Sequence, residues 1–285
     1  MQAISEGIYY ETAYPGVTLG AIILPRGTLM IDAPLRADDA RTWKSVLLTQ
    51  SRGSHRLMVN LDAHPDRTLG TRSLECSVLV HQETADLFET RTTVFKGQAG
   101  ITSAEWEHYP DVIGSRWVRP NLTFTDRIKL HWGDPDVIIE HHPGPTPGSV
   151  WVIVPSEKIV FVGDTVTPGQ PPFLEDADLP VWFESLNQLT SRKYKNYMIV
   201  SGRGGITDIE SIRAQRKLLQ SVYRRLEALA GKDSPPEETE KLIDPVMQSI
   251  DHPQRLSEFY GQRLRHGFQQ YYLKHYFPEE ISEES

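Results

Sequence analysis

Short apolar runs dominate the first two thirds of the chain and predict a core rich in strands. Residues 16–24 and 28–32 are two such runs, and Pro25-Arg26-Gly27 between them predicts that they form a hairpin. Residues 38–50 instead carry apolar side chains at helical spacing and predict a helix. Strands joined partly by hairpins and partly by helices indicate an α/β (α+β) core with helices outside the sheets. Further strands are expected at residues 57–59, 77–80, 136–140, 149–154, 158–162 and 197–200.

From about residue 208 the chain becomes helical and charged, with apolar residues recurring every three to four positions. This pattern predicts helices over residues 209–229, 237–250 and 259–276. The aromatic residues of the third helix are expected to pack against the core, as aromatic residues at helical spacing commonly do. The acidic end, Glu279 to Ser285, is expected to fray.

The two regimes divide the chain into a sheet-rich domain over residues 1–205 and a helical C-terminal extension over residues 206–285 packed on it. The chain has 285 residues, of which 39% are hydrophobic and 24% charged, and this balance is typical of soluble globular proteins. The length is enough for a sizeable core.

Charge and cysteine content narrow the classes of partner. A formal net charge of −8 argues against a basic nucleic-acid-binding surface. The single cysteine, Cys76, excludes an internal disulfide and suits a reducing compartment. No apolar run reaches the length of a membrane span, and the N-terminus lacks the layout of a signal peptide. We therefore expect a cytoplasmic protein without nucleic-acid or membrane partners.

Asp62, His64 and Asp66 form a ladder with a spacing of two residues, directly after a predicted strand. Side chains at positions i, i+2 and i+4 of a chain leaving a strand lie on one side, so the three groups could converge on one point. Imidazole nitrogen and carboxylate oxygen suit zinc, iron or manganese. Aspartate and proline are also ordinary turn residues, so a solvated turn is the alternative interpretation.

Three further segments place polar residues just after predicted strands. They are His141 to Ser149, Phe161 to Thr165 and Ile199 to Gly205. Loops that follow strand ends in an α/β core are where ligand sites gather, so these segments could meet the Asp62 ladder in space.

The order and context of the four segments resemble the metallo-β-lactamase superfamily. Its motifs are H-x-H-x-D-H after a strand, P-G-H-T-x-G, G-D-T/S and G-H-G. The most specific matches are the turns Pro143 to Ser149 and Gly163-Asp164-Thr165, and the strand Thr28 to Asp32 resembles an early family strand that ends in aspartate. The resemblance covers roughly residues 8–205. It implies a four-layer αββα sandwich with one or two metals bound at the edge between two facing sheets.

The resemblance carries over to the ligand positions one at a time. His64, Asp66 and Asp164 match family ligands, and Asp62 stands where the first histidine usually is. These four residues are therefore the implied metal ligands. Asp66 also takes the implied catalytic role, which is to orient a metal-bound nucleophile.

Three other ligand positions have changed. Arg67 and Arg203 replace the last histidines of the first and fourth motifs, and Pro145 replaces the histidine of the second. We expect the arginines to form salt bridges with Asp66 and Asp164 that replace the metal, or to contact a substrate. The remaining oxygen-rich set predicts either no cofactor or one weakly bound divalent metal, which is zinc, manganese or iron.

His141 and His142 lie shortly before Pro145. Either could supply a ligand or contact a substrate, and the alternative is a satisfied or solvated histidine at a strand end.

Two function classes stay open. The first is a metal-assisted hydrolase of an ester, thioester, lactone or phosphodiester, with an altered or weakened activity. The second is a non-catalytic, metal-independent member that binds an anionic small molecule or a protein partner through Arg67 and Arg203. A homo-oligomer is compatible with both, and the substrate does not follow from the fold.

Overall fold

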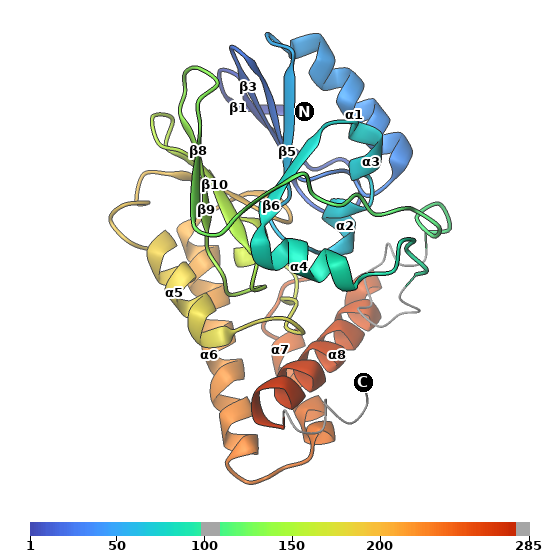
Figure 1. Cartoon of the computed structure of the whole chain (residues 1–285). Coiled ribbons are helices and arrows are strands. Elements are labelled where there is room, and N and C mark those ends of the chain that lie inside the picture. Colours follow the sequence, from blue (N-terminus) through green and yellow to red (C-terminus); the bar gives the residue numbers. More distant parts are fainter. Residues whose placement is uncertain (98–108, 278–285) are drawn as a thin grey trace.

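Two mixed β-sheets face each other at the centre of the structure, a computed structural model that describes residues 1–97 and 109–277 (Figure 1). The first sheet has seven strands in sequence order: β1 (Gln2–Ser5), β2 (Ile8–Glu11), β3 (Leu19–Leu24), β4 (Gly27–Ile31), β5 (His55–Val59), β6 (Ser77–His81) and β7 (Leu122–Phe124). The second has six, in the order β13 (Gly205–Thr207), β12 (Met198–Ser201), β11 (Ile159–Phe161), β10 (Val150–Val154), β9 (Val137–His141) and β8 (Arg127–Leu130).

Parallel pairing is confined to a few neighbours. Strands β4 to β7 run parallel to one another, as do β11 and β12, and all other pairs are antiparallel. The predicted hairpin is confirmed as β3 and β4, with Ile22 opposite Leu29.

The central strands are apolar throughout because both of their faces are buried. In β10, Val150, Val152 and Val154 face the other sheet, while Trp151 and Ile153 face the helices on the outer side. This alternation turns a continuous apolar run into two separate contact surfaces. The layer between the sheets is built from aliphatic side chains of both.

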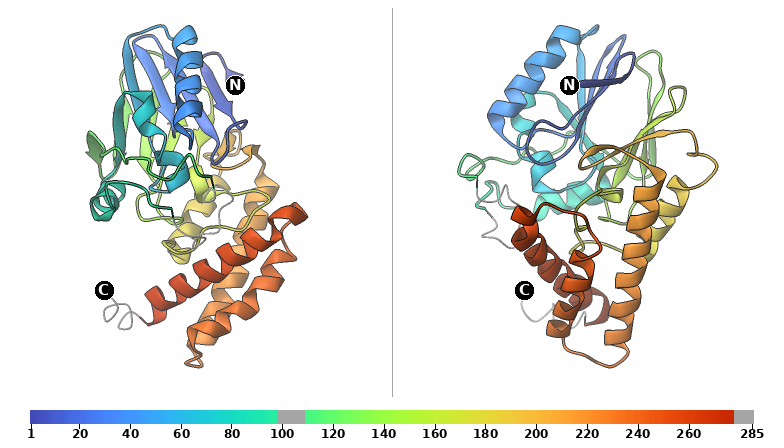
Figure 2. Two further views of the ribbon diagram at one scale, coloured as in Figure 1. Left: turned by 90° about the vertical axis from the view of Figure 1, so that its right-hand side faces the viewer. Right: turned by 180° about the vertical axis from the view of Figure 1, so that it is seen from behind.

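Helices cover the outer face of each sheet (Figures 1 and 2). On the seven-stranded sheet, α1 (Ala37–Gln50) inserts Trp43 and Leu47, and α4 (Gln82–Thr90) follows β6; the short helices α2 (Pro65–Thr68) and α3 (Thr71–Leu74) precede that strand. On the six-stranded sheet, α5 (Leu179–Leu189) and α6 (Ile209–Ala230) pack against Trp151. The expected four-layer αββα sandwich is therefore present.

The C-terminal helices lie across the lower end of the sandwich in Figure 1. The predicted third helix is α8 (Ser257–Tyr276), whose aromatic residues Phe268, Tyr271 and Tyr272 are buried in the same cluster as α5 and α6. The predicted fraying of Glu279 to Ser285 lies outside the described residues.

The predicted helix over residues 237–250 is only partly present. It consists of a 3-10 helix, η3 (Pro236–Leu242), and a short α7 (Ile243–Met247); a second 3-10 turn, η4 (Gln254–Leu256), precedes α8. Pro245 lies inside α7 and has no N–H to donate to the preceding turn, which limits regular α-helix in this segment.

Two observations bear on the division at residue 205, which stays a prediction. Strand β13 spans that position and pairs with β12. Helix α6 belongs to the same hydrophobic cluster as Ile153 and Val160 of the sheet. The first C-terminal helix is thus also the outer layer of the sandwich.

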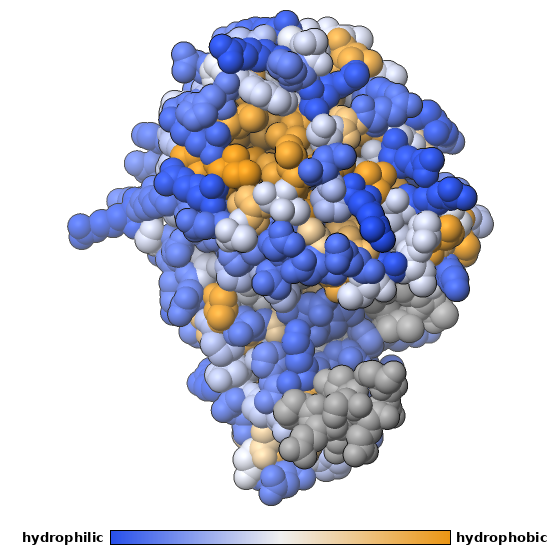
Figure 3. Space-filling view, in the orientation of Figure 1, coloured by the Kyte–Doolittle hydropathy of each residue, from blue (hydrophilic) through white to orange (hydrophobic). Residues whose placement is uncertain are grey.

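The surface also differs between the two parts. Figure 3 shows apolar residues gathered over the upper, sheet-containing half of one face, whereas the helical lower part is largely hydrophilic. Within the described part of the chain, no helix combines the length and apolar character needed to cross a lipid bilayer.

Candidate functional site

The polar loops that the sequence singled out meet at one end of the two sheets. Asp32 follows β4, and the segment from Asp62 to Arg67 follows β5, which runs parallel to β4. In the other sheet Asp164 lies in a 3-10 turn, η2 (Gly163–Thr165), after β11, and Arg203 lies in the turn between β12 and β13. Because β11 and β12 are parallel, their carboxyl ends deliver these residues to the same edge.

Arg67 connects three aspartates. Its Nε lies 2.8 Å from Asp62 Oδ1, its Nη1 donates to Asp32 Oδ2 at 2.6 Å, and its Nη2 donates to Asp164 Oδ1 at 2.6 Å. The side chain is fully buried. Its backbone is fixed as well, because the Arg67 carbonyl accepts hydrogen bonds from Asn60 Nδ2 and the Ala33 amide.

Arg203 forms the second half of the cluster. Its Nη1 and Nη2 lie 2.5 and 3.2 Å from the two carboxylate oxygens of Asp66, a bidentate arrangement. Its Nη2 also donates to Asp164 Oδ2 at 3.0 Å. Both arginines that replaced family histidines are therefore held by carboxylates, which is the salt-bridge arrangement that the sequence suggested.

Asp164 is shared by the two arginines, with one carboxylate oxygen on each. Burial alone would raise its pKa, but the positive charges of Arg203 and Arg67 hold the pKa well below the usual range. We call the set of Asp32, Asp62, Asp66, Asp164, Arg67 and Arg203 the arginine–aspartate cluster. It is buried throughout, since each of these side chains is at most 5% exposed.

Asp32 adopts a left-handed backbone conformation with φ 60°, which is uncommon for a residue with a side chain. The conformation is supported locally, because the Leu61 amide donates to Asp32 Oδ1 and the Asp32 amide donates to the Val59 carbonyl. Burial raises the pKa of Asp32 to about 7 despite the nearby Arg67. The sequence matched this residue only as the end of an early family strand.

His64 lies at the edge of the cluster. Its Nδ1 is 2.9 Å from Asp62 Oδ1 and 3.5 Å from Asp164 Oδ2. Burial would lower its pKa, but the charges of Asp62 and Asp164 raise the pKa to about 9. Among the described residues, Asp62, His64 and Asp164 form a group that could hold a metal ion, with one ligand atom from each residue within 4.8 Å of the others.

The donor set does not fit a dinuclear metal centre. Asp66, which would hold only the second ion, is engaged by Arg203 on both oxygens, and Asp164 has one oxygen on each arginine. A divalent ion there would face two guanidinium groups at close range in a buried site. The Asp62, His64 and Asp164 group is different, because the buried Asp62 Oδ2 has no hydrogen-bond partner in residues 1–97 or 109–277. The residues therefore fit one ion at most.

Phe173 and Arg263 cover the cluster. The Phe173 ring lies 4.8 Å from the His64 ring, 4.6 Å from Arg203 Cζ and 4.1 Å from Arg263 Cζ. Arg263 comes from α8 and donates to Gln170 Oε1 and to a backbone carbonyl of the same loop. Sequence reasoning missed Arg263. The available signal was a charged residue on the buried face of an amphipathic helix, a position that charged residues rarely take without a partner.

His142 contacts Trp151 and Glu140 and not the cluster. Its ring stacks on Trp151 at 3.6 Å, and its Nε2 lies 3.3 Å from Glu140 Oε1. His141 stacks on His81 instead. The contacts of both histidines are thus with these neighbours and not with the arginine–aspartate cluster. Pro145, which replaces a family histidine, is buried in the turn between β9 and β10.

Comparison with known proteins supports the metallo-β-lactamase fold. Residues 80–202 match the sequence model of the metallo-beta-lactamase superfamily, while no curated protein matches the sequence significantly. A metallo-beta-lactamase from Pontibacter korlensis is similar in structure, with a TM-score of 0.58 and 20% identity over 77% of this chain and 97% of that chain. The metallo-beta-lactamase DIM-1 gives a TM-score of 0.59 and 19% identity over 77% and 96%.

A third similar structure includes the C-terminal helices. The stereoselective inverting sec-alkylsulfatase Pisa1 from Pseudomonas sp. covers 98% of this chain with a TM-score of 0.68 and 11% identity. The chain matches 51% of that enzyme's length. These identities are low, so the structural similarity shows the fold and not the activity. Over residues 80–202 the sequence is similar to the metallo-β-lactamase superfamily, and the structure shares the fold of its solved members.

Proposed function

We propose that Arg67 and Arg203 take the place of the dinuclear metal centre, so that metal-dependent hydrolysis is lost or weak and the protein acts as a metal-independent binding member of its family. One observation carries the proposal: Asp164, which matches the family's bridging aspartate, accepts hydrogen bonds from both arginines. Each guanidinium also holds another aspartate of the ligand set, Asp62 or Asp66.

The energetic argument concerns displacement. An ion that took Asp66 and Asp164 would have to break buried charge-assisted hydrogen bonds of Arg203 and Arg67. It would leave guanidinium groups buried without their carboxylates, which costs about 3–5 kcal/mol for a single broken pair. An arginine is a fixed cation at any physiological pH, so the cluster has its positive charge built in.

The same contacts bear on ligand binding. The predicted use of Arg67 and Arg203 for an anionic ligand would require the ligand to replace an aspartate, because both guanidinium groups are already paired. Beside the cluster, however, lies a cavity of about 520 Å³, which His64 and Thr146 line from the cluster side. A small-molecule ligand would therefore bind in the cavity, next to the cluster.

A single-ion hydrolase is the second candidate. It is favoured by the unpartnered Oδ2 of Asp62 in the group with His64 and Asp164, and structurally similar proteins include a β-lactamase and an alkylsulfatase. An ester, thioester, lactone or phosphodiester would be its substrate class. In that case Asp66 would still be held by Arg203 and could not orient a nucleophile from its present position.

Hydrolysis assays with added metal distinguish the two candidates. The protein is supplied with zinc, manganese or iron(II) and assayed on a chromogenic ester, thioester, lactone and phosphodiester, with and without chelator. The proposal expects no turnover that chelator abolishes. Turnover that is lost both with chelator and in Asp62→Asn, but retained in the exposed control Asp38→Asn, would establish the single-ion hydrolase instead.

A further inference from the structure

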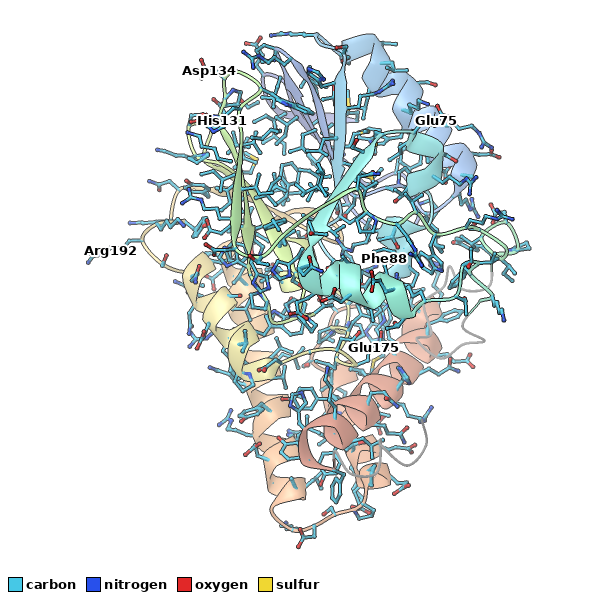
Figure 4. The ribbon with its side chains drawn as sticks, viewed as in Figure 1. Glu75, Phe88, His131, Asp134, Glu175 and Arg192 are labelled. Carbon is cyan, nitrogen blue, oxygen red and sulfur yellow. The ribbon has the colours of Figure 1, made fainter. Side chains whose placement is uncertain are left out.

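An arginine outside the cluster lines the adjacent cavity, and it has no carboxylate partner among the described residues. Arg91 follows α4 and lines the cavity of about 520 Å³ together with Lys96, Trp117 and Glu175. Figure 4 shows Phe88 on α4 and Glu175 below it, toward α8. We infer that this cavity binds a small molecule that carries a carboxylate or phosphate group, and that Arg91 is the residue that binds the anion. The inference deepens, and rests on, the proposed metal-independent binding function.

The hydrogen-bond state of Arg91 supports the inference. Its Nη2 donates to the carbonyl of Ala63, which lies between Asp62 and His64 in the chain. Its Nη1 is buried and has no hydrogen-bond partner within the described part of the chain. The Cζ atom lies 4.5 Å from the centre of the Trp117 ring and 4.8 Å from that of Phe88, so the aromatic rings hold the plane of the group. One donor edge is thus held in place but unused.

The charge of Arg91 is also unpaired. No carboxylate of residues 1–97 or 109–277 lies within ion-pair distance of it. Burial lowers the pKa of Arg91 to about 10, which leaves the side chain charged at neutral pH. Arg91 is half-buried, and its buried Nη1 donor is unfavourable unless an acceptor such as an anion satisfies it. A carboxylate or a phosphate offers two oxygens that can accept parallel hydrogen bonds from a guanidinium.

The other lining residues favour the Arg91 end of the cavity for the anion. Lys96 adds an exposed positive charge near Arg91. Glu175 and Asp176 line the cavity as well and would repel an anion, although Glu175 is engaged with His266 at 2.8 Å. The cavity is also lined by apolar residues that could contact the body of a small ligand: Ala63, Pro65, Leu87 and Phe95.

Arg91 differs from the arginines of the cluster in this respect. Arg67 and Arg203 hold carboxylates on two sides each, and both are at most 5% exposed. Arg36 makes a useful control, since it also stacks on an aromatic ring, that of Tyr109 at 4.4 Å, but is paired with Asp111 and does not line this cavity.

The test is calorimetric titration of the full chain with two probes, inorganic phosphate and benzoate. We expect saturable binding of at least one probe, weakened about tenfold or more in Arg91→Gln and unchanged in Arg36→Gln. The probe that binds more tightly identifies the class of anion. Absence of saturable binding of both probes, or equal binding by Arg91→Gln, would overturn the inference.

A second measurement covers the case in which Arg91→Gln does not fold. In the unmodified protein, phenylglyoxal modification of Arg91 is followed by peptide mass spectrometry with and without the probe that binds. Protection of Arg91 but not Arg36 supports the inference, and equal modification of Arg91 with and without probe contradicts it. Metal content tests the proposed function separately, so a metal-loaded protein would overturn that function while these titrations judge Arg91.

Discussion

Arg67 Nη2 and Asp164 Oδ1 form a fully buried ion pair at 2.6 Å that links the two sheets at the end of the sandwich. Arg67 follows β5 of the seven-stranded sheet, and Asp164 follows β11 of the six-stranded one. The pair lies where the family resemblance places a bridging aspartate and its metal. This geometry supports the proposal that a side-chain cation takes the place of the family's metal ion.

Removing the Arg67 guanidinium should destabilise the protein strongly. In Arg67→Met, Asp32, Asp62 and Asp164 lose their shared partner while staying buried, and we expect a loss of about 3–5 kcal/mol in the free energy of unfolding. Urea denaturation measures the loss. The matched control is Arg41→Gln, which breaks an exposed pair with Asp38 and should cost at most about 0.5 kcal/mol. Equal stabilities of the two variants would show that the cluster has no structural role.

Phe173 should be important both for stability and for keeping water out of the cluster. It is 7% exposed and packs over His64, Arg203 and Arg263. Phe173→Ala should cost about 3–5 kcal/mol, as expected for a large aromatic side chain removed from a packed position. The comparison is Ile113→Ala at a side chain that is 53% exposed, where thermal unfolding should change little. A Phe173→Ala protein as stable as the Ile113→Ala protein would argue against the covering role.

How far the sequence predicted the site follows from where its residues lie in the chain. Asp62 to Arg67, Asp164 and Arg203 were found because each stands in a short motif directly after a strand, where local pattern is informative. The salt bridges between them were predicted only as a hypothesis. They depend on how the two sheets pack together, and Arg67 and Asp164 are about a hundred residues apart in the chain. No feature of the sequence indicated that Asp32 pairs with Arg67. Asp32 was matched only as the end of an early family strand.

Residues that reach the site from helices were missed for a physical reason. Arg263 lies on α8, whose apolar pattern predicts packing, and pattern does not reveal which loop a long side chain will reach. Arg91 follows α4, a helix that the sequence did not predict. The central strands were easier to predict, because both of their faces are buried and they form continuous apolar runs. Helices α4 and α5 were not predicted. The short edge strands β1, β7 and β13 also lack a clear apolar run and were not predicted.

His142 should make stability depend on pH in a defined window. Burial lowers the pKa of His142 from 6.5 to about 3, and the charges of Lys193 and His141 act in the same direction. The ring stacks on Trp151, and its Nε2 lies 3.3 Å from Glu140 Oε1. Above pH 6.5 the ring is neutral in both the folded and unfolded states. Below that value the unfolded chain binds a proton that the folded protein does not, so stability falls as pH decreases toward 3.

The expected slope from this group is at most about 1.4 kcal/mol per pH unit, measured by urea denaturation between about pH 7 and pH 5. His142→Gln should remove this contribution, and His131→Gln, at an exposed position, should not. An unchanged slope in His142→Gln would mean that Glu140 stabilises a charged ring in the folded protein.

Restoring the family's histidines should restore metal binding. In the triple variant Pro145→His, Arg67→His and Arg203→His, the two guanidinium groups are removed, and imidazoles are placed at the three changed positions of the family's ligand set. Zinc affinity measured by competition with a chelator should rise by about tenfold or more over the unmodified protein. Equal affinity of both proteins for zinc would indicate that the arginines do not keep metal out.

The central claim is that the arginine–aspartate cluster replaces a metal centre, and elemental analysis tests it most directly. The protein is produced with zinc, manganese and iron supplied, purified without chelator and analysed for metal per chain. The account predicts well under one metal ion per chain, with the salt bridges of Arg67 and Arg203 intact. Close to one or two ions per chain, bound through Asp62, His64 and Asp164, would contradict it.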